Sequence, residues 1–146
     1  MTVSSSSTGA ISPLSDTRVP RYSVRAVTTN AGLNLAFPSL RHPSSSLPIL
    51  DIVGSTTNGL AEILLQSSFE GSFGVSTSRV HQADFSSGST PESDPLGLGR
   101  QQQIDLTTSE KSRKEGRVYW GDLDDGRELG RVDLSTSNRP ASLRIQ

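Results

Sequence analysis

The chain of 146 residues contains no cysteine. This absence excludes disulfide bonds, thiolate metal ligands and a cysteine nucleophile. Small secreted domains often depend on disulfides, so the composition favours a cytoplasmic location. The first residues show no basic segment followed by an apolar one, and we expect no signal peptide. The chain also lacks an apolar run of the ~18–20 residues that a membrane helix requires, so we expect no transmembrane segment.

The hydrophobic content and the net charge are both low. Hydrophobic residues make up 32% of the chain and aromatic residues 5%, whereas about 45–50% apolar residues is usual in globular domains. We therefore expect one domain with a thin core. The formal net charge of −1 gives no reason to expect a nucleic-acid partner. The basic run at 111–114 is flanked by Glu110 and Glu115, so its local charge is nearly balanced.

Motifs for catalysis and for metal or cofactor binding are missing as well. The sequence has no Gly-x-Ser-x-Gly element of a serine hydrolase. His42 and His81 lie about forty residues apart and form a poor metal site without cysteine. The segment 122–126, D-L-D-D-G, resembles a calcium loop, but its Gly comes fifth where an EF-hand needs it sixth. We therefore expect no catalytic, cofactor-binding or metal-binding residues, and we expect that the protein is not an enzyme.

What the chain does contain is a repeated pattern of alternating apolar residues, which indicates strands with one buried face. In three segments a Thr precedes an Asn by two positions, and the next apolar residue follows the Asn by three. These structural turn positions are Thr28 and Asn30, Thr56 and Asn58, and Thr136 and Asn138. Asn tolerates a left-handed backbone and can bond the turn, so we expect each pair to precede a tight turn. Two further segments alternate in the same way but carry Arg79 and Glu110 at the turn.

Each strand-turn-strand unit is too small to bury its apolar face alone, so the units must stack. The sequence therefore predicts an all-β fold, an irregular β-solenoid of about five strand-turn-strand units. A two-sheet β-sandwich is the alternative. Stacking in sequence order would align the five threonines into one ladder: Thr28, Thr56, Thr77, Thr108 and Thr136. It would also leave the last unit, 132–146, at a free edge, with a charged or polar rim that includes Arg131, Asp133, Arg144 and Gln146.

Composition also divides the chain. Residues 1–20 are rich in Ser and Thr and contain two prolines, which predicts a disordered head. Residues 21–146 form a single β-repeat domain, with mobile loops at about 38–48 and 86–100, where Pro, Gly and Ser accumulate. Trp120 lies on the core register and Tyr119 faces outward, although an aromatic ligand platform at this pair is the alternative.

Three features resemble those of an uncharacterised fungal domain: the Thr-x-Asn repeats, the S-S-F-E-G-S-F segment at 67–73, and the E-G-R-V-Y-W-G segment at 115–121. That domain is similar to bacterial adhesin-like β-repeat domains. The resemblance covers residues 22–146 and implies a solenoid or sandwich-like repeat fold, without catalytic residues to carry over. Arg79 and Glu110 depart from it, because they replace the turn Asn.

These observations predict a non-enzymatic structural or interaction module of the adhesin-like type. Its partner, a protein or a glycan, would bind solvent-facing strands or an open sheet edge. The alternative is a carbohydrate-active or carbohydrate-binding β-solenoid protein. A cleft with two convergent carboxylates would favour hydrolysis. The acidic residues expected to face outward are scattered along the chain: Asp51, Glu62, Asp105 and Asp133.

Overall fold

The computed structural model describes residues 4–9, 21–37, 49–88, 94, 97–122 and 129–146, and every regular element in them is a β-strand. The all-β prediction is therefore confirmed. The larger sheet contains seven strands, in the order β1 (Ser4–Gly9), β2 (Arg21–Thr28), β4 (Ile49–Thr56), β10 (Gly130–Thr136), β6 (Gly71–Ser76), β9 (Arg113–Trp120) and β8 (Gln102–Glu110). The smaller sheet contains four, in the order β3 (Leu33–Ala36), β5 (Ala61–Leu65), β11 (Ala141–Ile145) and β7 (Ala83–Ser87).

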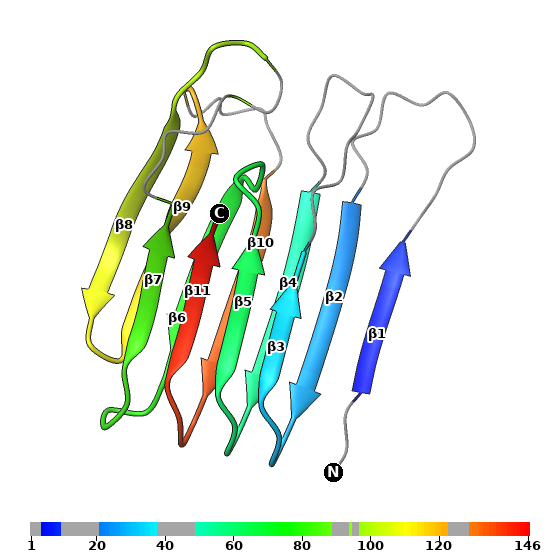
Figure 1. Cartoon of the computed structure of the whole chain (residues 1–146), viewed down its shortest axis with the longest axis vertical. Coiled ribbons are helices and arrows are strands. Elements are labelled where there is room, and N and C mark those ends of the chain that lie inside the picture. Colours follow the sequence, from blue (N-terminus) through cyan, green and yellow to red (C-terminus); the bar gives the residue numbers. More distant parts are fainter. Residues whose placement is uncertain (1–3, 10–20, 38–48, 89–93, 95–96, 123–128) are drawn as a thin grey trace.

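Four units run from the larger sheet into the smaller one through a short turn: β2–β3, β4–β5, β6–β7 and β10–β11. Neighbouring units pair in parallel in both sheets. Figure 1 shows the smaller sheet in front of the larger one, with these turns at one end of the molecule. Alternation in the sequence therefore identified the units, because each strand buries one face against the opposite sheet.

The order of the units differs from the prediction, and the sequential solenoid is wrong. The last unit, β10–β11, lies between β4–β5 and β6–β7 in both sheets. The fourth segment does not cross between the sheets at all, because β8 and β9 form an antiparallel hairpin at the edge of the larger sheet. Its turn, at residues 111–112, is too short to reach the other sheet. Two facing sheets, open at their sides, describe the arrangement better.

The expected free edge at 132–146 is also wrong. β10 and β11 are paired on both sides, so Arg131 and Asp133 lie in the middle of the outer face of the larger sheet. Arg144 is exposed on the outer face of the smaller sheet, and the amide of Gln146 donates to the carbonyl of Leu65 at 3.0 Å. Alternation predicts which face a residue occupies, but it carries no information about neighbouring strands.

The core lies between the two sheets. The inward residues of the central strands are almost fully buried, among them Ile52, Ile63, Val75, Val132, Leu134 and Leu143. Burying each such side chain stabilises the fold by about 1.5–3 kcal/mol. Phe73 of the larger sheet stacks on Phe85 of the smaller one, with ring centroids 4.2 Å apart. This contact joins the sheets beside β9.

Trp120 is 1% exposed, which confirms its predicted place in the core. Its indole Nε1 donates to the carbonyl of Ser67 at 2.8 Å, so its polar atom is satisfied. Tyr119, the preceding residue, faces the other way, and its hydroxyl donates to Asp105 Oδ2 at 2.9 Å. The ring of Trp120 is therefore not an exposed ligand platform.

Three segments singled out by composition are only partly described. Within 1–20, residues Ser4–Gly9 form β1, which pairs antiparallel with β2. The segment 38–48 lies outside the described residues. Within 86–100, β7 ends at Ser87 and Asp94 is held by hydrogen bonds. In the described part of the chain, no helix is long and apolar enough to cross a membrane.

Candidate functional site

A groove of about 570 Å³ crosses the outer face of the larger sheet over β10, β6 and β9. Its floor is at Gly74, which pairs with Asp133 on one side and Glu115 on the other. A Cβ atom at Gly74 would stand 3.3 Å from Asp133 Oδ1 and 3.9 Å from Glu115 Cγ. The missing side chain therefore opens space between two rows of charged residues.

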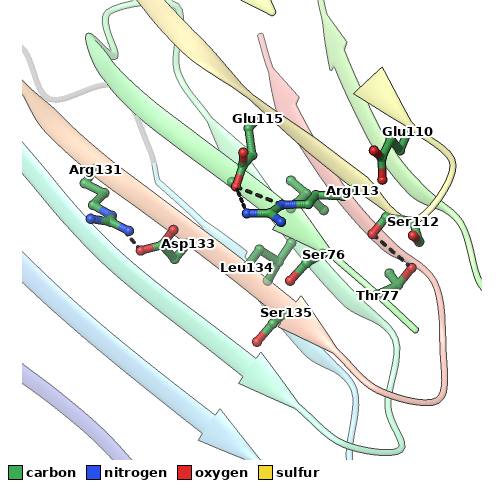
Figure 2. Close-up of a pocket in the computed structure, with 12 residues that line it drawn as sticks. Ser76, Thr77, Glu110, Ser112, Arg113, Glu115, Arg131, Asp133, Leu134 and Ser135 are labelled. Carbon is green, nitrogen blue, oxygen red and sulfur yellow. Dashed lines mark hydrogen bonds and ion pairs between the residues drawn. The ribbon is translucent and has the colours of Figure 1, made fainter. Parts of the chain in front are cut away.

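Two ion pairs form the walls of the groove (Figure 2). Their carboxylate residues, Asp133 and Glu115, pair with Gly74 from opposite sides. Arg131 Nε lies 2.7 Å from Asp133 Oδ2 on β10. Arg113 donates to Glu115 Oε1 from Nε at 2.9 Å and from a terminal nitrogen at 2.6 Å on β9. Both pairs join residues two apart on one strand, which point to the same face of a sheet. Exposed pairs of this kind add little to stability, so their polar groups are free to serve binding.

The surroundings of Glu115 favour the ionised form of its carboxylate. The hydrogen bond from Arg113 is the main reason that the pKa of Glu115 lies below its usual value. Thr108 adds a further hydrogen bond to Oε2 at 3.3 Å. A glycosidase general acid needs a raised pKa instead, so Glu115 is suited to accept hydrogen bonds rather than to deliver a proton. With Ser76 and Ser135 beside them, the paired charges offer both donors and acceptors.

Sequence reasoning missed this groove as a site. Two signals were present: a Gly inside an alternating strand, which often marks close approach or open space, and acidic and basic residues two positions apart. However, the groove combines the segments 71–76, 113–120 and 130–136, which are adjacent only because β10 inserts beside β6. The prediction placed Arg131 and Asp133 at the rim of the last unit, which a sequential stack does not bring beside the unit of Gly74.

The three predicted threonines end adjacent parallel strands and are buried: Thr28 at 3% exposure, Thr56 at 2% and Thr136 at 5%. Each bonds the turn beside it. Thr56 Oγ1 donates to the carbonyl of Ala31 at 3.0 Å, and Thr136 Oγ1 donates to the carbonyl of Gly59 at 3.1 Å. The hydroxyls of Thr56 and Thr136 thus link one turn to the next, whereas Thr28 Oγ1 accepts the amide of Ala31 in its own turn. All three serve the fold, because the groove lies elsewhere.

The three predicted asparagines also lie side by side. Asn58 Nδ2 donates to Asn30 Oδ1 at 2.8 Å, and Asn138 Nδ2 donates to Asn58 Oδ1. The resulting row of amides is exposed at the turn end of the molecule. The structure therefore brings all six predicted turn residues into two neighbouring ladders.

Thr77 and Thr108 do not extend the threonine ladder in the same way. Thr77 follows β6 and donates to the carbonyl of His81 in its own turn at 3.0 Å. Thr108 lies on β8, where a bulge between Leu106 and Thr108 shifts the register. A bulge re-aims the side chains that follow it, and Thr108 consequently bonds Glu115 on the outer face.

The expected left-handed backbone at the turn asparagines is wrong. No non-glycine residue in the described part of the chain has a positive φ, and Gly59 is not among the glycines that do. Gly59 is required for a different reason: a Cβ there would stand 2.0 Å from the carbonyl oxygen of Ala31 in the neighbouring turn. Close stacking of the turns, and not their dihedral angles, therefore selects this residue.

A second polar cluster is buried where the hairpin joins the rest of the fold. The side chain of Asp94 is 1% exposed and pairs with Arg100, whose Nε lies 2.9 Å from Oδ2. The hydrogen bond to Asp94 raises the pKa of Arg100. Glu70, 8% exposed, accepts the backbone amide of Trp120 at 2.8 Å. The polar groups of this cluster are hydrogen-bonded to one another and to the backbone, so the cluster holds the segments together and is not a reactive site.

Among the described residues, no group of three His, Asp or Glu could hold a metal ion. The calcium-like segment 122–126 is described only at Asp122, and its other residues lie outside the described part. Comparison with family models, with curated proteins and with solved structures finds no match to this chain.

Proposed function

We propose that the protein is a non-enzymatic interaction module that binds a protein partner in the groove over Gly74. The observation that carries this proposal is the pair of oriented ion pairs on either side of an empty floor, Arg131 with Asp133 and Arg113 with Glu115. Interleaved charges of both signs favour a partner with a complementary pattern, because complementary charges select partners and speed encounter. The adhesin-like resemblance of the sequence agrees with such a role.

The same chemistry supports a glycan as the second candidate. Carboxylates, guanidinium groups and serine hydroxyls are the acceptors and donors that sugar hydroxyls require. The described residues that line the groove include no aromatic ring on which a sugar could stack, and Tyr119, on the same strand as Glu115, is already bonded to Asp105. This absence makes the protein partner the better candidate.

Filling the groove tests the proposal. In Gly74→Leu the new side chain would occupy the space between Asp133 and Glu115 without entering the core. A matched control is Ser142→Leu, which adds the same group on the outer face of the smaller sheet. Wild type and both variants would be immobilised and probed with cell extract and with a glycan array. We expect the groove variant alone to lose the captured partner by about tenfold or more, equal to ~1.4 kcal/mol of binding free energy.

Exchanging the two charges of one wall is a sharper variant. The double substitution Arg113→Glu with Glu115→Arg keeps the net charge and an ion pair two residues apart on β9. It reverses only the pattern that the partner meets, so stability should stay close to that of the wild type while capture falls. Capture that survives both this exchange and Gly74→Leu would refute the groove as the binding site.

A further inference from the structure

β8 is the last strand at one edge of the larger sheet. β8 runs from Gln102 to Glu110, and in the described part of the chain it pairs only with β9. Figure 1 shows it at the side of the molecule opposite β1. An open edge presents backbone donors and acceptors to which another strand can add. What such a strand must look like depends on which groups of β8 are free and on the side chains around them.

The hydrogen bonds of β9 show which groups of β8 are in use. The amide of Gly121 donates to the carbonyl of Gln101 at 2.8 Å. Hydrogen-bonded pairs alternate along an antiparallel ladder, so in this register Gln103 and Asp105 are the next residues of β8 that bond to β9. The backbone amides and carbonyls of these residues therefore form hydrogen bonds with β9 and do not face the open edge.

The hydrogen bonds between β9 and β6 lead to the same assignment of bonded and free residues. The amide of Thr77 donates to the carbonyl of Ser112 at 2.8 Å, beside the register in which β6 pairs with β9. Even-numbered residues of β9 consequently bond to β6, and odd-numbered residues remain for β8. Ile104 and Leu106 face Val118 and the even-numbered Gly116. Their own amide and carbonyl groups must point outward, to the open edge.

The side chains of Ile104 and Leu106 lie on the inner face of the larger sheet. The larger sheet has seven strands and the smaller one four, and the outermost strand of the smaller sheet, β7, contacts β6 and β9. β8 therefore extends beyond the edge of the smaller sheet, and its inner face is not covered by β7. As a result Leu106 is 51% exposed, and Ile104 is only partly buried against the core. An added strand whose side chains faced inward would cover both residues.

Asp105 lies between these two residues and faces the outer side. It is exposed and accepts the hydroxyl of Tyr119 at 2.9 Å. A residue paired with it across the edge would have its side chain beside this carboxylate, and opposite charges at such positions are favourable. The edge therefore offers, in order, an apolar, an acidic and an apolar position.

We propose that β8 binds an extended peptide of a protein partner, which adds as an antiparallel strand and carries a basic residue between two apolar ones. The peptide backbone bonds to Ile104 and Leu106, its apolar side chains cover theirs, and its cation lies beside Asp105. This site is separate from the groove over Gly74, and either can exist without the other.

A second copy of the chain fits this edge less well. The register that brings Ile104 opposite Leu106 of the other copy also places Asp105 opposite Asp105, and like charges there are destabilising. Moving the register by two residues avoids this repulsion, but it leaves Leu106 opposite Gln102 in one direction and Ile104 opposite Thr108 in the other. The bulge after Leu106 prevents a longer ladder. The charge of Asp105 thus protects the edge from self-pairing while it selects a basic partner.

Amide hydrogen exchange tests both which amides of β8 point to the open edge and whether a peptide binds there. In the free chain, the amides of Ile104 and Leu106 should exchange faster than those of Gln103 and Asp105. A synthetic peptide with Val-Lys-Val at its centre should then slow exchange at Ile104 and Leu106. A peptide with Val-Glu-Val should bind about tenfold more weakly, because the like charge meets Asp105. Slow exchange at Ile104 and Leu106 in the free chain, or no binding of the lysine peptide, would overturn the proposal.

Two substitutions separate backbone pairing from charge. Leu106→Pro removes an amide that the fold does not use, which an edge strand tolerates, and it should abolish peptide binding. Asp105→Asn should bring the affinities for the two peptides together. Ser142→Leu, on the outer face of the smaller sheet, serves as the control with unchanged binding. Equal affinities in the wild type, or dimers of the free chain that Leu106→Pro dissociates, would contradict the choice of partner.

Discussion

Adding one methyl group at each of two glycines distinguishes their roles. Gly59→Ala would place a Cβ 2.0 Å from the carbonyl oxygen of Ala31 and 2.7 Å from the amide nitrogen of Gly32, both backbone atoms. Gly74→Ala would meet only side-chain atoms, the nearest 3.3 Å away on Asp133. Neither glycine has a positive φ, so the backbone of both positions accepts alanine. The two variants thus differ only in the space around the new carbon.

The magnitude follows from the hydrogen bonds at the stacked turns. To admit the methyl group, the turn at Gly59 must move away from Ala31, which disturbs three bonds. They join Asn58 N to the Thr29 carbonyl, Thr56 Oγ1 to the Ala31 carbonyl, and Thr136 Oγ1 to the Gly59 carbonyl. At about 1 kcal/mol each, their loss costs ~3 kcal/mol. Replacing Gly gains ~0.5 kcal/mol through the unfolded chain. Gly59→Ala should therefore lose about 2.5 kcal/mol.

Gly74→Ala should instead gain ~0.5 kcal/mol through the unfolded chain, because the contact at 3.3 Å is with the end of the exposed Asp133 side chain, which can turn aside. Thermal melts followed by far-UV circular dichroism, with urea titrations to check that the m-value is unchanged, would measure both. At ~2–4 °C per kcal/mol for a chain of this size, we expect a fall of roughly 5–10 °C for Gly59→Ala. A melting temperature for Gly59→Ala at or above that of the wild type would refute the close-packing account of this turn.

Three other outcomes are expected. A chain without its last unit, 130–146, should not fold, because both sheets lose a central strand. A chain without the first twenty residues should keep the fold. Circular dichroism of the two shortened chains would measure both outcomes. Glu70→Ala should be less stable than Glu70→Gln by ~1–2 kcal/mol in urea titrations, because the buried amide of Trp120 loses its acceptor. The hydrogen bond to Asp105 raises the pKa of Tyr119 in the folded chain. The stability that this hydrogen bond contributes is therefore complete below the pKa of the unfolded chain, and it is lost as pH rises through the pKa of the folded chain. Asp105→Asn should lower the pKa of Tyr119 in an absorbance titration.

The units of the fold were predictable from local pattern. Alternation identified β4–β5 and β10–β11 within a few residues, and the Thr-x-Asn positions identified the turns that stack. The reason given for the turn asparagines was nevertheless wrong. It assumed a requirement within one turn, whereas the amides of Asn30, Asn58 and Asn138 bond across turns. A ladder of this kind depends on which turns are neighbours.

The groove could not be predicted from the same pattern. Gly74, Glu115 and Asp133 come from three segments, and their adjacency depends on the insertion of β10 beside β6. A sequential stack would have separated Gly74, in the third unit, from Asp133, in the fifth. Local alternation also could not show that β8 and β9 turn back within one sheet, although their two-residue turn leaves no length for a crossing.

The sequence by itself determined the strand-turn-strand units and, outside the bulge of β8, the face on which the side chains of the strands lie. These properties follow from period-two alternation and from turn residues, which act over a few positions. Only the tertiary structure decided that the last unit completes the middle of both sheets, and that β8 is left as an edge. Parallel units with the same inward apolar residues can pair in several orders, and the order that is observed depends on how the whole set covers its core and its edges.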